Sequence, residues 1–212
     1  MRITSRGLFA TDVEVEAARW VQRKLGSCEH ERRVLAIAAK LFEMTRPLLG
    51  LGLCESRLLR LGALSHDIGR SVSEKNHPDE GAKLILATTA LDLSPFDRRA
   101  LAFLARYHRG SVPPALREEY LRPLDARRPL RAVLGLLRVA DALDSRRIES
   151  PRLLFSMAGR KLSIRCFVDP VNLRAARDVY RRRKKFHLLE SFLGHDIDIE
   201  VDRSDALAVI AS

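Results

Sequence analysis

The feature that most constrains this chain is an apolar segment with helical spacing that ends at an adjacent histidine and aspartate, His66 and Asp67. The leucines of this segment are Leu58, Leu59, Leu61 and Leu64. Neighbouring side chains on a helix point about 100° apart, but one metal ion at a helix end can still take an imidazole nitrogen and a carboxylate oxygen from such a pair. Gly69 then lets the chain turn away. Because most adjacent His-Asp pairs bind nothing, the interpretation depends on further ligands.

Two more polar residues lie in apolar helical segments. His30 opens a run with helical spacing, formed by Val34, Leu35, Ile37, Ala38, Leu41 and Phe42. Asp141 lies inside the apolar segment 134–143, where a buried carboxylate is costly unless a charged group pairs with it. A divalent cation would supply that charge, and so would an arginine such as Arg33. The chain thus offers four candidate metal ligands, which are His30, His66, Asp67 and Asp141.

This ligand pattern resembles that of the HD-domain superfamily of metal-dependent phosphohydrolases. Residues 75–86 resemble the loop and helix start that carry a second-metal histidine in the two-metal enzymes of this superfamily, here His77. Residues 105–109 resemble the segment that carries another such histidine, here His108. Four of the six histidines in the chain therefore fall on positions of the motif.

Within the superfamily, segments 106–109 and 137–144 are most similar to the C-terminal HD region of the exopolyphosphatase and guanosine pentaphosphatase family. The resemblance extends roughly from the first helix to Val201. Those exopolyphosphatases hydrolyse their substrate in upstream actin-like domains, which this sequence lacks, and it contains no glycine-rich phosphate loop followed by Lys-Ser or Lys-Thr. Polyphosphatase activity is therefore not carried over.

The resemblance implies a phosphohydrolase that uses a metal-bound hydroxide to cleave a phosphate ester or anhydride. It implies that Asp67 bridges two metals, that His30, His66 and Asp141 complete the first, and that His77 and His108 complete the second. Asp67 and His66 would be the catalytic residues. Imidazole and carboxylate ligands suit manganese, iron, cobalt or zinc, and magnesium is also compatible, with one or two ions bound. Such metals lower the pKa of a bound water toward ~7.

The chain is strongly basic, with 38 Lys and Arg residues against 27 Asp and Glu and a net charge of +11. This balance favours a phosphate-containing partner such as a nucleotide, polyphosphate or nucleic acid, although basic surface composition alone is an equally good explanation. The cations that adjoin ligand positions are the candidate substrate-binding residues, namely Arg70, Lys75, Arg109 and Arg146. Their alternative role is solvated surface charge.

The basic run 181–185 has two interpretations. Five successive cations on a helix spread around its axis, so a solvated helix face is favoured over a binding site for nucleic acid or polyphosphate. The net charge nevertheless motivates a second functional hypothesis, an HD module that binds polyphosphate, nucleotide or RNA without catalysis.

The three cysteines are widely spaced, which fits a reducing cytoplasm better than a disulfide framework. They are Cys28, Cys54 and Cys166. No apolar run approaches the length of a membrane span, so we expect a cytoplasmic protein without a membrane partner. A homodimer stays an open alternative.

The expected fold is mainly α, with an HD-domain helical bundle over residues 1–150 and a small α+β appendage over residues 151–212. The helices of the bundle are expected at residues 11–25, 27–45, 55–66, 78–90 and 94–108, followed by a long apolar helix that ends near Ser145. Residues 110–128 are rich in proline and indicate a loop with a short helix.

The hydrophobic period changes in the appendage. Alternating polar and apolar residues predict strands at 161–168 and 196–201, on either side of a helix at 172–193. A right-handed crossover would make these strands parallel if they are adjacent. Residues 152–157 are a candidate third strand.

Overall fold

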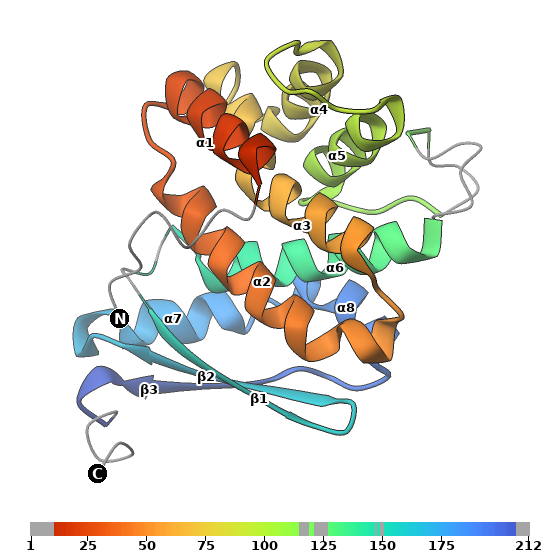
Figure 1. Ribbon diagram of the computed structural model, residues 1–212. Helices are drawn as coiled ribbons and strands as arrows, with labels where there is room; N and C mark the ends of the chain where they lie inside the picture. Colours follow the sequence, from red (N-terminus) through yellow and green to blue (C-terminus); the bar gives the residue numbers. More distant parts are fainter. Residues whose placement is uncertain (1–10, 115–118, 121–126, 147, 149–150, 207–212) are drawn as a thin grey trace.

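The helical part of the fold is a bundle built around α3, which spans Leu53–Ser65. The computed structural model describes residues 11–114, 119–120, 127–146, 148 and 151–206. The other helices of the bundle are α1 Asp12–Leu25, α2 Glu29–Leu49, α4 His77–Ala87, α5 Pro95–Tyr107 and α6 Arg127–Leu143. Helix α3 packs against α1, α2, α5 and α6 (Figure 1). Four of its leucines lie in the core that these helices share, namely Leu58, Leu59, Leu61 and Leu64. A 3-10 turn, η2 Ile68–Ser71, follows α3 and packs against α4.

A small sheet and two short helices follow the bundle. These elements are β1 Arg152–Ala158, β2 Lys161–Val168, α7 Leu173–Tyr180, α8 His187–Leu193 and β3 Asp198–Arg203. The strand order is β1-β2-β3, with β1 antiparallel and β3 parallel to β2. The third strand and the parallel pairing are therefore confirmed. Figure 1 shows α7 and α8 on the side of the sheet that faces α6, and both helices contact α6. The mainly α fold with a small C-terminal α+β part is confirmed.

Local capping signals place several helix ends where the sequence predicts them. The Thr11 hydroxyl accepts the Glu14 N–H at the start of α1, and Gly26 ends that helix with a φ of 77°. The Ser94 hydroxyl accepts the Asp97 N–H at the start of α5. These ends depend on residues within four positions of one another, which is why the sequence alone is sufficient to find them.

Helix α2 continues past Pro47 to Leu49, so the prediction that it ends before the proline is wrong. A proline in the last turn loses only the hydrogen bond to the carbonyl of Glu43. Leu49 is buried, and Gly50, with a φ of 66°, then ends the helix. Burial of an apolar side chain here outweighs the loss of one hydrogen bond.

Residues 172–193 do not form the continuous helix that the sequence predicts. Helix α7 ends at Tyr180, a 3-10 turn, η4 Arg183–Lys185, follows, and α8 begins at His187. Tyr180 and Phe186, on either side of the basic run, are both buried. The prediction of a helical face for the basic run 181–185 is therefore wrong, because tertiary contacts of the residues around it outweigh helix propensity.

Two expectations lie beyond what the structure tests. The short helix expected within 110–128 stays a prediction, because residues 115–118 and 121–126 of this segment lie outside the described residues. The boundary near residue 150 stays a prediction. Within the described part of the chain, no helix combines the length and apolar character needed to cross a membrane.

Candidate metal centre

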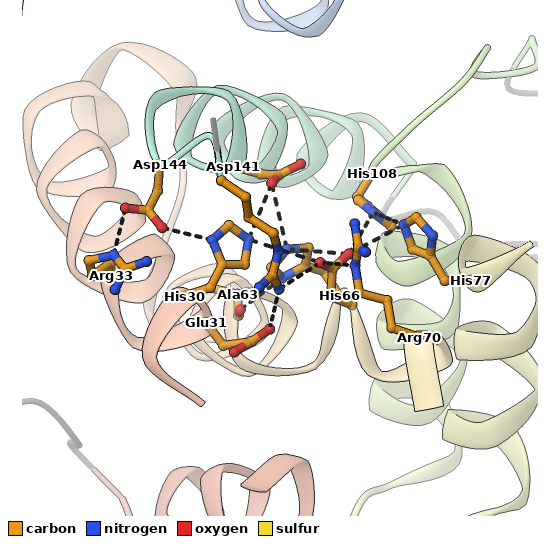
Figure 2. Close-up of polar contacts among 12 residues, drawn as sticks. His30, Glu31, Arg33, Ala63, His66, Arg70, His77, His108, Asp141 and Asp144 are labelled. Atoms are coloured by element: carbon orange, nitrogen blue, oxygen red, sulfur yellow. Dashed lines mark hydrogen bonds and ion pairs between the residues drawn. The ribbon is translucent and has the colours of Figure 1, made fainter. Parts of the chain in front are cut away.

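Helix ends bring the six predicted ligands to one place inside the bundle (Figure 2). His30 lies in the first turn of α2, His66 caps the C-terminus of α3, and Asp67 follows it. His77 begins α4, His108 caps the C-terminus of α5, and Asp141 lies in the last turn of α6. The exposed fraction of every one of these residues is at most 8%. Residues far apart in sequence thus meet in a water-poor environment.

The six residues form two groups. In the first group, Oδ1 of Asp141 lies 3.5 Å from Nε2 of His30 and 3.8 Å from Nε2 of His66. The second group consists of Asp67, His77 and His108. Within each group the candidate ligand atoms lie within 4.8 Å of one another, which is compatible with a single ion.

Asp67 lies between the two groups. Its Oδ1 is 3.3 Å from Nε2 of both His77 and His108 and 3.8 Å from Nε2 of His66. Its Oδ2 is 4.0 Å from Nε2 of His30. One carboxylate therefore faces histidines of both groups, which is the arrangement that a bridging ligand requires.

The four histidines share one orientation. Each Nδ1 contacts an oxygen at 2.7–2.9 Å: Ala63 O for His66, Glu74 O for His77, Ala105 O for His108 and Asp144 Oδ2 for His30. Because these oxygens are acceptors, each Nδ1 carries the hydrogen. The lone pair of each neutral ring is then on Nε2, the atom that faces the other ligands.

Three of the converging nitrogen atoms, those of His66, His77 and His108, have no hydrogen-bond donor beside them within the described part of the chain. Nε2 of His77 and Nε2 of His108 lie 3.3 Å apart, although both are acceptors in this tautomer. Nε2 of His66 is buried and has no hydrogen-bond partner among the described residues. Buried acceptors without a donor cost free energy, and a divalent cation satisfies several of them at once. The residues present therefore fit a metal centre.

Both buried carboxylates are ionised. Burial alone would raise the pKa of Asp67, but the interaction with His66 beside it holds that pKa well below its ordinary value. Burial also opposes the charge of Asp141, whose pKa is nevertheless held well below the ordinary value, first by the Lys185 ammonium. Lys185 pairs with Oδ2 of Asp141, which leaves Oδ1 directed at the histidines. Two permanent negative charges thus lie at the centre.

The imidazoles differ from one another. Burial would lower the pKa of His30, but hydrogen bonds to Asp141 and Asp144 outweigh it and raise the pKa to about 9. Burial lowers the pKa of His108 to about 4, although Asp67 opposes this shift. In the metal-free chain, His30 therefore stabilises the fold below its ordinary pKa of 6.5, and that contribution is lost as the pH rises through about 9.

We expect metal binding near pH 7.5 to release at least one proton per chain, because His30 must give up the proton that its pKa of about 9 retains. The apparent affinity should rise by up to about tenfold per pH unit between pH 6.5 and 9. Titration calorimetry with Mn²⁺ in two buffers of different ionisation enthalpy measures the number of protons. Asp144→Asn, which weakens a hydrogen bond that raises this pKa, should release fewer. An absence of proton release in the wild type would contradict the raised pKa of His30.

Asp144 orients one of the candidate ligands, His30. Its Oδ2 accepts the His30 Nδ1–H at 2.7 Å, and its Oδ1 accepts the Arg33 Nε–H at 2.8 Å. The position of Asp144, one helical turn after Asp141 in the sequence, suits such a hydrogen bond to a candidate ligand histidine. Arg33, the alternative partner considered for Asp141, pairs with Asp144 instead. This chain of contacts fixes the orientation of the His30 ring.

Three of the four predicted substrate-binding cations line the pocket over the centre. Arg70 Nε donates to Oδ2 of Asp67 at 2.6 Å, and Arg146 donates to the same oxygen at 3.1 Å. Arg109 is exposed and lines the pocket, and no carboxylate of the described residues pairs with it. Lys75 is exposed and does not line the pocket, so the structure does not bring it to the site.

The pocket also contains cations that the sequence analysis did not assign to the metal site. It has a volume of about 1090 Å³ and opens onto His30, Asp67 and Asp141. The additional basic side chains that line it are Arg131, Arg138, Arg182, Lys184 and Lys185. Arg138, which interrupts the apolar segment 132–140 of α6, was a signal in the sequence. The basic run 181–185 was considered as a polyanion site, but no local signal pairs Lys185 with Asp141, which lies 44 residues away in the sequence.

Comparison with known families agrees with this geometry. The family model described as HD domain matches residues 28–146, which is more than half of the chain and includes all six converging residues. No curated protein matches the chain. The closer relationship to exopolyphosphatases stays a prediction. The chain belongs to the HD-domain family.

Proposed function

We propose that this chain is a metal-dependent phosphohydrolase that hydrolyses a phosphate ester or anhydride of a nucleotide or related polyanion. The observation that carries the proposal is the convergence of four buried imidazole Nε2 atoms on two buried carboxylates. The family supports it, since HD-domain proteins are generally metal-dependent hydrolases. Imidazole with carboxylate favours manganese, iron, cobalt or zinc, with magnesium as a further candidate.

Different residues of the chain have different proposed roles at this site. A divalent ion bound there lowers the pKa of a water ligand and polarises a phosphoryl oxygen. Asp67 and His66 would be ligands at the reacting centre, which is the catalytic role we assign to them. Arg70 and Arg146 contact the outer oxygen of Asp67 and line the pocket, where their remaining N–H groups can bind phosphate oxygens. Both side chains are partly exposed, 20% and 48% respectively, and therefore accessible to a substrate.

A non-catalytic module that binds polyphosphate, nucleotide or RNA is the second candidate. The observation that favours it is the excess of cations in the pocket. A pure binding module does not need six buried metal-type ligands, since solvent-facing arginine and lysine side chains suffice to hold a polyanion. The ligand set therefore favours the enzyme.

The test is hydrolysis by the full chain, first treated with chelator and then reloaded with Mn²⁺. Substrates should include p-nitrophenyl phosphate, bis(p-nitrophenyl) phosphate, nucleoside triphosphates and inorganic tripolyphosphate. We expect turnover of at least one substrate by the reloaded protein and none by the metal-free protein. Metal-free turnover equal to that of the reloaded protein would contradict the proposal, and the absence of all turnover by metal-loaded protein would favour the binding module.

A further inference from the structure

Part of the pocket wall comes from the chain beyond the family match, which ends at residue 146. The pocket residues of this later segment are Val179, Arg182, Lys184, Lys185, His187, Leu188 and Ser191. They lie in the break between α7 and α8 and at the adjoining helix ends. The HD family match therefore does not account for them.

The pocket contains more cations than its carboxylates neutralise. Its basic residues are Arg70, Arg109, Arg131, Arg138, Arg146, Arg182, Lys184 and Lys185. Its carboxylates are Asp67, Glu74 and Asp141. Each of these already forms an ion pair with one of the basic residues, namely Arg70, Arg146 or Lys185. Within the described ranges, no carboxylate pairs with the remaining five, which leaves an excess of positive charge for a ligand.

A buried arginine holds this wall in place. Arg138 is 5% exposed. Its guanidinium donates to three backbone carbonyl oxygens, those of Tyr107 (3.2 Å), Gly110 (3.0 Å) and Lys184 (3.3 Å). These bonds tie both the loop after His108 and the turn η4 to α6. The basic turn is therefore fixed relative to the metal centre.

The break in the helix directs successive cations to different places. Arg182 has φ −80° and ψ 87°, which lies outside the helical region. Arg183 pairs with Glu190, while Lys185 pairs with a carboxylate of the metal centre. Arg182 and Lys184 are exposed and line the pocket. A continuous helix would instead distribute these side chains around its axis.

We propose that Arg182 and Lys184, together with Arg109 and Arg131, form a second anion subsite of this pocket. This proposal rests on the proposed function: the subsite binds those phosphate groups of the substrate that are not at the metal centre. A pocket of about 1090 Å³ is larger than one phosphate group needs. The ligand class is therefore a small polyanion with several linked phosphates, supplied either as a nucleoside polyphosphate or as short inorganic polyphosphate.

Binding of inorganic tripolyphosphate and of orthophosphate to the metal-free full chain, measured by titration calorimetry, tests the subsite. The test variant is Arg182→Ala/Lys184→Ala. The matched control is Arg177→Ala/Arg181→Ala, which removes the same charge from exposed arginines of the same region that line a different cavity. We expect the wild type to prefer tripolyphosphate over orthophosphate by at least about tenfold, the test variant to lose about tenfold in tripolyphosphate affinity, and the control to change less than about twofold.

Equal losses in the two double variants would overturn the proposal, because they would indicate general electrostatic attraction. A wild type without preference for tripolyphosphate would also overturn it. ATP carries a triphosphate like that of tripolyphosphate. Its affinity for the test variant should therefore fall by the same factor, whether the natural ligand is a nucleoside polyphosphate or inorganic polyphosphate. An unchanged ATP affinity would count against the subsite. Binding is measured without metal and without turnover. The subsite can therefore be confirmed even if the chain hydrolyses nothing, and it can be refuted even if the chain is an active hydrolase.

Discussion

Asp67→Ala is expected to lower metal-dependent turnover by ~10³-fold or more, the largest effect of any single substitution in this chain. Asp67 is the one residue whose carboxylate faces histidines of both ligand groups in the described structure. Its removal leaves His77 and His108 without a carboxylate and Arg70 without its partner of 2.6 Å. Steady-state kinetics of the Mn²⁺-reloaded variant measure the loss, with circular dichroism to show that the fold persists.

The chain offers a matched control for this substitution. The tripeptide His-Asp-Ile occurs twice, at 66–68 and at 195–197. In the second copy His195 and Asp196 are exposed, so Asp196→Ala removes the same side chain from the same local sequence without touching the pocket. It should retain wild-type turnover. Full activity in Asp67→Ala, or an equal loss in Asp196→Ala, would contradict the assignment.

Gly69→Ala is expected to destabilise the protein by about 1–3 kcal/mol and to displace His77. A Cβ atom at position 69 would lie 2.1 Å from the carbonyl oxygen of His77 and 2.4 Å from the backbone nitrogen of Gly81. Both are backbone atoms of α4, so the helix start that carries His77 has to shift. A ligand displaced by about 1 Å costs on the order of 10²-fold in rate.

Urea unfolding and metal content per chain measure the two consequences. Gly52→Ala is a suitable control, because a Cβ atom there meets only Oε2 of Glu55, at the ordinary distance of 3.5 Å. It should bind as much metal as the wild type. A Gly69→Ala protein with wild-type stability and wild-type metal content would show that the close approach of η2 to α4 is dispensable.

The role of Gly69 differs from the sequence expectation in an instructive way. The sequence predicts a glycine that lets the chain turn away from His66 and Asp67. In the structure Gly69 instead permits two backbone segments to meet, which joins the His-Asp pair to the helix that begins at His77. Whether a position must be glycine so that another backbone segment can approach it depends on which segment packs there, and a single sequence does not specify that segment.

Features that depend on neighbours in sequence are predictable. The alternation of polar and apolar residues predicts β2 with the bounds observed, Lys161–Val168. Four candidate ligands, His30, His66, Asp67 and Asp141, are predictable for a related reason, since each lies in or directly after an apolar segment with helical spacing. The resemblance to the HD superfamily, and not the local pattern, supplied His77 and His108. The two His-Asp-Ile copies show the limit of local sequence: only the preceding buried helix α3 distinguishes the copy at residue 66.

Features that depend on distant partners were missed. The break at Arg182 follows from contacts of Arg183 with Glu190 and of Lys185 with Asp141, none of which has a local signature. The pocket wall exists because these contacts outweigh the helix propensity of the segment. The wall of the pocket formed by the turn between α7 and α8 thus follows from tertiary contacts and not from local sequence.

Metal content per chain tests the central claim most directly. Elemental analysis of protein purified without a histidine tag and incubated with Mn²⁺ should give close to two ions per wild-type chain. His77→Ala/His108→Ala should reduce this to about one ion, since His30, His66 and Asp141 form a separate group. A wild-type chain that holds no transition metal after this incubation would contradict the metal centre.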